Sequence, residues 1–356
     1  MKEGWIIEEN YIIDPHDPIL ITGANGFIGS RVVEVLLGYG FGNLRCLARP
    51  SSNLDRLKSI ADVNSINVAL GNLISPYDCD EAAKGVSVVY HLAASSGDKS
   101  FTGAYKNTVD TTRYLLEAVL KSNHLKRFVN ISSFAVYSNE NVRSGALIDE
   151  TSEVESHPEL RGEAYCYAKV KQEELLKEYG RRHSIPYVIL RPGTVYGPGN
   201  KEITARVGIR RLGLFLHLGG SNRIPLTYVN NCAEAIVLAG LRKGVDGEVF
   251  NVVDDDIPTS REFLRMYKKR VKHIKSIYLP KPLSYILCFL WENCSKLSGG
   301  RLPPMLNRKR WSAEWKGNKY SNEKLKKLLG WKPKVSLEEG LRRYFEYCRE
   351  VGESNE

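Results

Sequence analysis

A glycine-rich turn between a short apolar strand and a helix constrains this chain more than any other feature of its sequence. Residues 22–29 read Thr-Gly-Ala-Asn-Gly-Phe-Ile-Gly, after the apolar run Ile19–Ile21 and before a segment with helical spacing. Gly23 allows a tight turn, Gly26 lets the backbone approach a pyrophosphate, and Gly29 lets helix and strand pack closely. Because a strand precedes the turn and a helix follows it, a dinucleotide site at the positive end of the helix is favoured over a purely structural turn.

Short apolar segments alternate with helical segments through the first two hundred residues. Long helices are expected at Phe101–Ser122 and Glu163–His183. The further expected strands are Leu44–Ala48, Ile66–Leu70, Val86–His91, Arg127–Ser132 and Tyr187–Leu190. This alternation predicts βαβ units and a parallel sheet with right-handed crossovers.

The alternation weakens after about Pro198. The predicted fold is therefore α/β: a Rossmann-type doubly wound parallel sheet over residues 19–198, after an N-terminal leader at 1–18. Residues 199–356 are expected to form a smaller, mainly substrate-binding region, from which one strand at about 248–253 returns to the core.

Charge and cysteine content limit the classes of partner and the compartment. With 51 Lys and Arg against 41 Asp and Glu, the net charge is +10, which favours nucleic acid, a phospholipid surface or a phosphorylated small molecule. A solvated basic face explains the same charge. The first eighteen residues carry five acidic residues and no sustained apolar run, so no signal peptide is expected. Seven scattered cysteines without a Cys-x-x-Cys indicate reduced thiols, a cytoplasmic location and no metal site.

The nearest candidate for a membrane segment is residues 282–291, which read PLSYILCFLW. This is about half the roughly twenty apolar residues that a spanning helix needs, so no transmembrane segment is expected. We expect a helix packed over a pocket. Peripheral membrane contact is the alternative, because Lys281, Lys296 and Arg301 flank the segment.

The residue about twenty positions beyond the turn indicates which dinucleotide is bound, since an acidic residue there binds the ribose 2′-hydroxyl of NAD. This chain has Arg49 at that place, followed by Ser51 and Ser52. A guanidinium with nearby hydroxyls suits a 2′-phosphate, so NADP is favoured over NAD. A solvated loop arginine is the alternative.

Tyr165 and Lys169 lie four residues apart, which places them on one face of the predicted helix. A nearby ammonium, reinforced by an oxidised nicotinamide, favours the phenolate and is expected to lower the pKa of Tyr165, which could then exchange a proton with a substrate oxygen. Ser132 and Ser133 close a predicted strand, where a parallel sheet presents catalytic groups. The Tyr–Lys pair alone fits an ordinary surface helix, and the two serines alone fit an ordinary turn. The hypothesis of a catalytic site therefore depends on their occurring together with the glycine turn.

These segments together resemble the extended short-chain dehydrogenase/reductase superfamily, in its NAD(P)-dependent epimerase/dehydratase branch. The resemblance extends from Ile19 to about Arg349. The matching segments are TGANGFIG (22–29), GNL (71–73), HLAA (91–94), VNISSFAVY (129–137), YCYAK (165–169), LRPGTVYGPG (190–199), LTYVNNCAEAIVLAG (226–240) and LGWKPKVSLEEGLRR (329–343).

The resemblance implies a catalytic triad of Ser133, Tyr165 and Lys169, in which Lys169 also holds the nicotinamide ribose. Hydride would move between nicotinamide and a carbinol carbon while Tyr165 handles the proton. The residues assigned to the cofactor are Gly23, Asn25, Gly26, Phe27, Ile28, Gly29, Arg49, Asn72, Leu73, Leu92, Ala93, Ala94, Tyr165, Lys169, Pro192 and Val195.

Departures from the family pattern narrow the reaction. The 4,6-dehydratases follow their Ser/Thr with an Asp-Glu pair, whereas Phe134 and Ala135 stand here, which argues against a dehydratase. Thr194 replaces an Asn that touches the substrate in nucleotide-sugar epimerases, and Arg206 is a candidate for a substrate diphosphate. Ser133, Thr194 and Arg206 are therefore the expected substrate-binding residues.

The resulting hypothesis is an oxidoreductase or epimerase acting at a hydroxyl or keto carbon of a nucleotide-linked sugar. The alternatives are a 3β-hydroxysteroid or dihydroflavonol type of dehydrogenase/reductase, and a non-catalytic cofactor-sensing or RNA-binding protein. Tyr165 and Lys169 are both present and no RNA-module signature is found, so no nucleic-acid partner is expected. By the resemblance, a homodimer would form through the two long helices.

Overall fold

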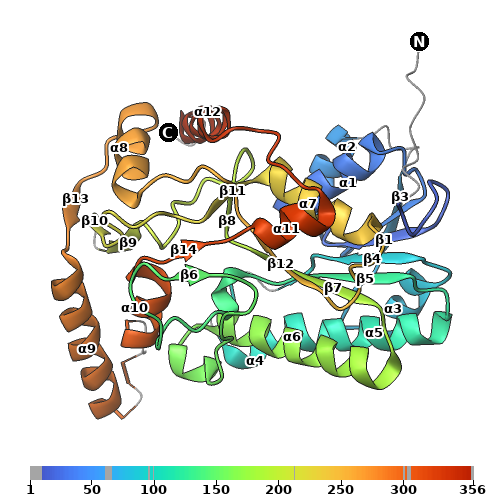
Figure 1. Ribbon diagram of the computed structural model, residues 1–356, viewed down its shortest axis with the longest axis horizontal. Coiled ribbons are helices and arrows are strands. Elements are labelled where there is room, and N and C mark those ends of the chain that lie inside the picture. The colour runs from blue at the N-terminus through green and yellow to red at the C-terminus, as the bar shows by residue number, and fades with distance from the viewer. Residues whose placement is uncertain are drawn as a thin grey trace.

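The computed structural model describes residues 10–60, 66–94, 97–98, 100–211, 213–299, 301–302 and 306–353. Within these ranges, seven parallel strands form one sheet in the order β3-β2-β1-β4-β5-β7-β12 (Figure 1). This order reverses direction between β1 and β4, which is the arrangement of a doubly wound sheet. The predicted fold class is confirmed.

The sheet strands coincide with the expected apolar segments to within two residues at each end. They are β1 (Ile19–Thr22), β2 (Leu44–Ala48), β3 (Asn67–Leu70), β4 (Val88–His91), β5 (Arg127–Ile131), β7 (Tyr187–Pro192) and β12 (Val249–Val252). Every residue of β1, β4 and β5 is buried. Helices cover both faces of the sheet, so these central strands are buried along their whole length and do not alternate between buried and exposed residues.

Two layers of helices enclose the sheet, as Figure 1 shows. One layer contains α1 (Phe27–Gly38), α2 (Asp55–Ile60), α7 (Val229–Leu241) and α11 (Glu323–Leu329). The other contains α3 (Pro76–Ala83), α4 (Phe101–Tyr105), α5 (Thr111–Ser122) and α6 (Ala164–His183). Helix α7 packs extensively along α1, so this helix of the 199–356 part joins the core together with β12.

The long helix expected at 101–122 is present with an irregularity. A π-helical stretch, η2 (Lys106–Asp110), joins α4 to α5. Both α4 and η2 pack against α6, the helix that carries Tyr165 and Lys169. Such π-helical stretches occur frequently at functional sites.

The remaining elements lie beyond the carboxyl edge of the sheet. They are η3 (Phe134–Val136), β6 (Leu147–Ile148), η4 (Pro158–Arg161), β8 (Thr194–Tyr196), β9 (Gly208–Arg211), β10 (Leu214–His217), β11 (Leu226–Tyr228), α8 (Ser260–Arg270), β13 (Ser276–Tyr278), α9 (Lys281–Leu297), α10 (Arg308–Trp315), β14 (Lys319–Tyr320) and α12 (Leu337–Glu353). β6 pairs with β14, so a loop of the core and the C-terminal part form one small sheet.

The apolar segment at 282–291 is helical, as part of α9, but it lines neither of the two pockets identified in the described ranges. Its large apolar side chains face outward, and its buried residues are small: Ser284, Cys288 and Ser295. The expectation of a helix packed over a pocket is therefore wrong. No helix in the described ranges is both long and apolar enough to cross a bilayer.

The described end of the leader packs against the core. The Ile12 amide donates to the Leu241 carbonyl over 2.8 Å, and Ile13 is buried in the cluster beneath α1 and α7. Residues 1–9 of the expected leader lie outside the described ranges.

Candidate active site

The glycine turn has the geometry that its sequence predicts. Gly23 adopts a φ of +69°, in the region that favours glycine. A Cβ on Gly29 would lie 2.1 Å from the Gly23 carbonyl oxygen, so only glycine fits where the helix meets the turn. Gly26 caps α1 without a side-chain hydrogen bond, and the first turn of α1 carries no acidic residue. The turn thus offers backbone N–H groups at the helix start, where a pyrophosphate binds.

The other residues assigned to the cofactor follow the carboxyl ends of successive strands. Arg49 is exposed directly after β2, and Asn72 is exposed after β3. Ala93 follows β4, and its amide donates to Thr22 Oγ1 over 3.3 Å. The remaining members occupy the same edge: Leu73 after β3, Leu92 and Ala94 after β4, Pro192 ending β7, Val195 on β8, and Asn25, Phe27 and Ile28 beside the glycines. Ligands of open parallel sheets bind along this edge.

The two serines at the end of β5 have different environments. Ser132 is 3% exposed and donates to Glu173 Oε1 over 2.6 Å, so its hydroxyl links the end of β5 to α6 within the core. Ser133 lines a pocket, and its Oγ accepts a hydrogen bond from the Ala135 amide at the start of η3. Since successive side chains of an extended segment point to opposite sides, only Ser133 is presented to a substrate.

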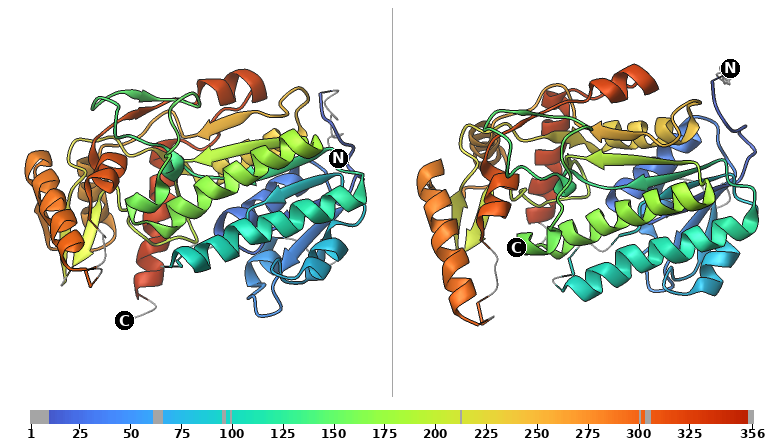
Figure 2. Two further views of the ribbon diagram at one scale, coloured as in Figure 1. Left: turned by 90° about the horizontal axis from the view of Figure 1, so that it is seen from below. Right: turned by 60° about the horizontal axis from the view of Figure 1, so that its bottom comes forward.

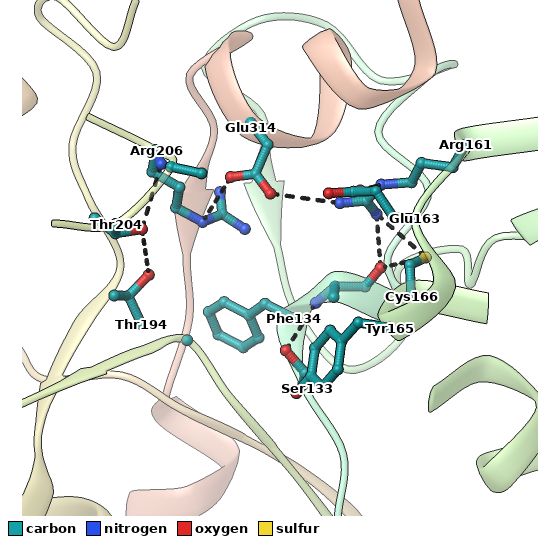
Figure 3. A pocket seen from close by; sticks show the side chains of 13 residues that line it. Ser133, Phe134, Arg161, Glu163, Tyr165, Cys166, Thr194, Thr204, Arg206 and Glu314 are labelled. Atoms are coloured by element: carbon teal, nitrogen blue, oxygen red, sulfur yellow. Dashed lines mark hydrogen bonds and ion pairs between the residues drawn. The ribbon is translucent and has the colours of Figure 1, made fainter. Parts of the chain in front are cut away.

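Tyr165 lies next to Ser133 at the wall of this pocket (Figure 3). Its side chain is 37% exposed. Desolvation by burial raises the pKa of Tyr165, and a hydrogen bond with Ser133 lowers that pKa in part. The expectation that Lys169 lowers this pKa is wrong for the structure, because desolvation, which the sequence argument left out, dominates.

Lys169 is buried beneath the carboxyl edge of the sheet, at 4% exposure. Its ammonium donates to the Ile131 carbonyl over 2.6 Å and to Gln172 Oε1 over 2.9 Å. Desolvation lowers the pKa of Lys169 to about 7, although the charge of Glu173 raises it. The lysine therefore changes charge near neutral pH.

A chain of buried hydrogen bonds joins Lys169 to the glycine turn. Gln172 Nε2 donates to Thr112 Oγ1 over 2.8 Å, and Thr112 Oγ1 lies 2.9 Å from His91 Nε2. His91 Nδ1 lies 2.8 Å from Thr22 Oγ1, at the end of β1. Burial, followed by the charge of Lys169, lowers the pKa of His91 to about 3, so the imidazole is neutral. The sequence argument missed this network because its members come from four separate elements.

A buried ion pair fixes α6, the helix that carries Tyr165 and Lys169. Arg191 on β7 donates to both oxygens of Glu173 on α6, over 2.9 and 2.6 Å. Both side chains are 2% exposed. A bidentate pair of this kind fixes both position and orientation. It therefore sets the distance between α6 and the sheet edge.

The pocket beside Ser133 and Tyr165 has a volume of about 170 Å³. Thr194 and Arg206, both expected to bind substrate, lie across it from Tyr165 (Figure 3). Its remaining lining residues are Phe134, Ala135, Arg161, Glu163, Cys166, Gly193, Thr204, Ala205 and Glu314. None of the pocket residues identified in the described ranges comes from α9.

Paired charges line the far side of this pocket, and the sequence argument missed most of them. Arg206 lies 3.7 Å from Glu314, which lies 3.6 Å from Arg161. Arg161 in turn pairs with Glu163 over 2.5 Å. Glu163 could have been predicted to lie near the pocket, because it stands two residues before Tyr165. Nothing in the sequence links Glu314 on α10 to the pocket.

Arg206 does not form one basic face with Arg210 and Arg211. Arg206 is mostly buried and donates to Tyr320 Oη over 2.9 Å, whereas Arg210 and Arg211 lie exposed on β9. Arg206 lies in the turn before β9, so the three arginines do not share a helix face.

Across the described ranges, no group of three or more His, Cys, Asp or Glu side chains is arranged to hold a metal ion. All seven cysteines are free, and six of them are buried.

Known proteins resemble this chain in sequence and in fold. It is 24% identical over 333 residues to a sterol-4-alpha-carboxylate 3-dehydrogenase (decarboxylating) of Dictyostelium discoideum, covering 91% of this chain and 98% of that protein. It is 27% identical over 293 residues to an N-acetyl-alpha-D-glucosaminyl-diphospho-ditrans,octacis-undecaprenol 4-epimerase of Escherichia coli O157:H7, covering 80% and 82%.

Among solved structures, UDP-glucuronic acid 4-epimerase of Bacillus cereus, in complex with UDP-glucuronic acid and NAD, superposes with a TM-score of 0.71. The identity is 24%, and the match covers 94% of this chain and 99% of that one. A sequence profile of the NAD dependent epimerase/dehydratase family matches residues 19–252. The chain therefore belongs to the NAD dependent epimerase/dehydratase family.

Proposed function

We propose that this protein is an NAD(P)-dependent reductase or epimerase that acts at a hydroxyl or keto carbon of a nucleotide-linked sugar. The observation that carries the proposal is the pocket where Ser133 and Tyr165 face Thr194 and Arg206 (Figure 3). A phenol and a hydroxyl at one wall can bind the reacting oxygen, while hydroxyls and charged groups opposite bind the rest of a polar substrate.

The residues of the turn fit a dinucleotide, since the turn tolerates no side chain at Gly29, and α1 begins directly after Gly26 with backbone N–H groups that have no intrahelical acceptor. Gly23 to Gly29 would hold the pyrophosphate and Lys169 the nicotinamide ribose. When bound, the nicotinamide supplies the hydride acceptor or donor for the carbinol carbon. Arg49, exposed at the end of β2, supports NADP over NAD.

The chain's own residues handle the proton. Because the pKa of Tyr165 is raised, the phenol holds its proton at neutral pH and can donate it to a substrate oxygen. The Ser133 hydroxyl orients that oxygen, since its own Oγ is fixed by the Ala135 amide. In the opposite direction Tyr165 must first lose its proton, which its hydrogen bond with Ser133 favours.

The pocket's size and charge support a sugar over a steroid. Since each water occupies about 30 Å³ in the liquid, a volume of about 170 Å³ holds about six waters, which a monosaccharide could displace. A steroid ring system would take water from the Arg206–Glu314 ion pair without offering it new hydrogen bonds, at a desolvation cost. The similarity to a sterol dehydrogenase along 91% of this chain nevertheless supports a 3β-hydroxysteroid type of activity as the second candidate.

Mass spectrometry of the small molecules released from the purified protein tests the substrate and cofactor. A nucleotide sugar with tightly held NAD would support the epimerase, and exchangeable NADPH the reductase. A sterol would contradict the sugar proposal.

Exchange of Tyr165 for phenylalanine tests the chemistry. Turnover should be lost while dinucleotide affinity is retained. The matched control is Tyr167→Phe on the same helix, where the ring packs against Phe101 instead of lining the pocket. Unchanged turnover in Tyr165→Phe would remove the acid–base role from this residue.

A further inference from the structure

Helix α9 has its apolar side on the outside of the molecule. Its buried positions, Ser284, Cys288 and Ser295, repeat at intervals of four and seven residues and therefore share one face. The opposite face consists of Leu283, Ile286, Leu287, Leu290 and Leu297, which are between 43% and 87% exposed; we call these five residues the α9 apolar face. Contiguous exposed apolar surface of this kind marks an interaction site.

The helix is firmly held in this orientation. The Trp311 indole of α10 donates to Ser284 Oγ over 2.9 Å, and its ring meets that of Tyr285 edge-on at 5.0 Å. At the other end, Glu292 pairs with Arg308 of α10 over 2.9 Å. These contacts use the polar side of the helix. Rotating α9 to bury its leucines would break all of them.

The chain leading into α9 is strongly basic. Between Glu262 and Glu292 there are seven Lys and Arg residues and no Asp or Glu. They are Arg265, Lys268, Lys269, Arg270, Lys272, Lys275 and Lys281. Figures 1 and 2 show α8, β13 and α9 following one another along one edge of the molecule. On β13, Ile277 and Tyr278 are also exposed.

We propose that this edge docks the protein on anionic phospholipid bilayers, with the α9 apolar face inserted among the lipids at the interface. An interfacial helix needs an apolar face and nearby cationic residues that attract lipid phosphates, and this edge supplies both. A second copy of the chain fits less well, because two copies of this edge would repel each other through the seven basic residues that lie between Glu262 and Glu292.

Docking would place the pocket close to the membrane. Helix α10, against which α9 packs, carries Glu314 of the pocket wall. The Trp315 indole on the same helix donates to the carbonyl of Ala205, another pocket residue, over 2.8 Å. Helix α10 therefore contacts both the docking helix and the pocket wall.

Cys294 provides a native reporter for the test. It lies on α9, four residues beyond Leu290, and is exposed, whereas the other six cysteines are buried. We would label it with an environment-sensitive fluorophore and add vesicles of phosphatidylcholine alone or mixed with phosphatidylglycerol. The expected result is a blue-shifted emission and co-flotation with the mixed vesicles, weaker binding to the neutral ones, and loss of that difference at high salt.

Two variants separate docking from general effects on folding. Ile286→Asp combined with Leu290→Asp should lower vesicle affinity by at least about tenfold, because it removes apolar contacts and adds charges that anionic lipids repel. The control is Leu328→Asp, at a residue that is 40% exposed on α11, away from this edge (Figure 1). Circular dichroism should be the same for all three proteins.

Three outcomes would overturn the proposal: no vesicle binding by the wild type, equal binding by the double variant, or a dimer of the wild type that the double variant abolishes. The last outcome, measured by sedimentation without lipid, would assign the α9 apolar face to a second copy of the chain. None of these measurements depends on turnover or on the proposed substrate.

Discussion

The ammonium of Lys169 donates to Oε1 of Gln172 over 2.9 Å, one turn farther along the same buried face of α6. Gln172 is fully buried, and its amide nitrogen donates in turn to Thr112 on α5. A buried lysine keeps its position only when its hydrogen-bond partners are fixed. Gln172 is thus a positioning residue for Lys169, held by a neighbouring helix.

Replacing Gln172 by leucine should reduce kcat by on the order of tenfold or more, because Lys169 loses one of its two acceptors and reacting groups tolerate little displacement. Gln172→Glu keeps the acceptor and adds a negative charge, which should raise the pKa of Lys169. Steady-state kinetics over a range of pH would therefore show activity restored with a shifted profile. A leucine variant with the wild-type profile would contradict the positioning role.

Alanine at Gly29 should abolish dinucleotide binding and destabilise the protein, because the added Cβ would lie 2.1 Å from the Gly23 carbonyl oxygen. Gly38, at the other end of α1, is the matched control, since no atom lies within 4 Å of a Cβ built there. Gly38→Ala should leave binding unchanged and stabilise the fold by about 0.5–1 kcal/mol. Fluorescence titration with NADPH and thermal unfolding measure both effects. Retained binding in Gly29→Ala would contradict the assignment of the turn.

Methionine at Arg191 should lower the free energy of unfolding by about 3–5 kcal/mol, because Glu173 would be left buried without its bidentate partner. The comparison is Arg182→Met on α6, where the partner Glu178 and the arginine are both exposed. That change should cost no more than about 1 kcal/mol. Urea unfolding of both variants tests the prediction, and similar losses would contradict it.

Lys169 should make the unfolding free energy depend on pH. Its pKa is about 7 in the fold and near the ordinary value of 10.5 in the unfolded chain. Between these values the unfolded chain binds a proton that the fold does not, so the contribution of Lys169 to stability rises with pH. Lys169→Met removes that contribution. The variant should gain stability relative to the wild type most near pH 7 and least near pH 10, as measured by urea unfolding without cofactor.

Glutamate at Arg49 should reverse the preference between dinucleotides. A carboxylate at the end of β2 can bind a ribose 2′-hydroxyl but repels a 2′-phosphate, so the ratio of NADPH to NADH affinity should fall by about tenfold or more. Arg45→Gln, on the same strand, is the control, because Arg45 donates to the carbonyl of Ala82. If the ratio of NADPH to NADH affinity is unchanged in Arg49→Glu, Arg49 is a solvated loop arginine that does not contact the dinucleotide.

The sequence predicted the sheet well because its central strands are buried on both faces. A strand such as β1, four buried residues bounded by Pro18 and the glycine turn, has a strong local signal. The placement of the expected cofactor residues along one edge of the sheet followed from the same logic, since these residues come directly after the strands. Local pattern also located the ends of α6, which carries Tyr165 and Lys169.

Features that depend on burial and on contacts between distant residues could not be predicted from the sequence. The pKa of Tyr165 was predicted in the wrong direction because desolvation has no local sequence signal. Glu314 reaches the pocket only through the packing of α10, and the outward orientation of the leucines on α9 depends on the contacts of Trp311. The apolar run at 282–291 predicts a helix, but it does not show whether the large apolar residues or the small residues of that helix are buried.

Two tryptophans one turn apart on α10 link separate parts of the molecule. The indole of Trp311 donates to α9, and that of Trp315 donates to the backbone of the pocket wall. A substitution that shifts this two-turn helix would disturb both neighbours together. Substitutions in α10 that reshape the pocket for a new substrate must therefore also preserve the contacts between α10 and α9. The evolution of the pocket is thus linked to that of the α9 apolar face.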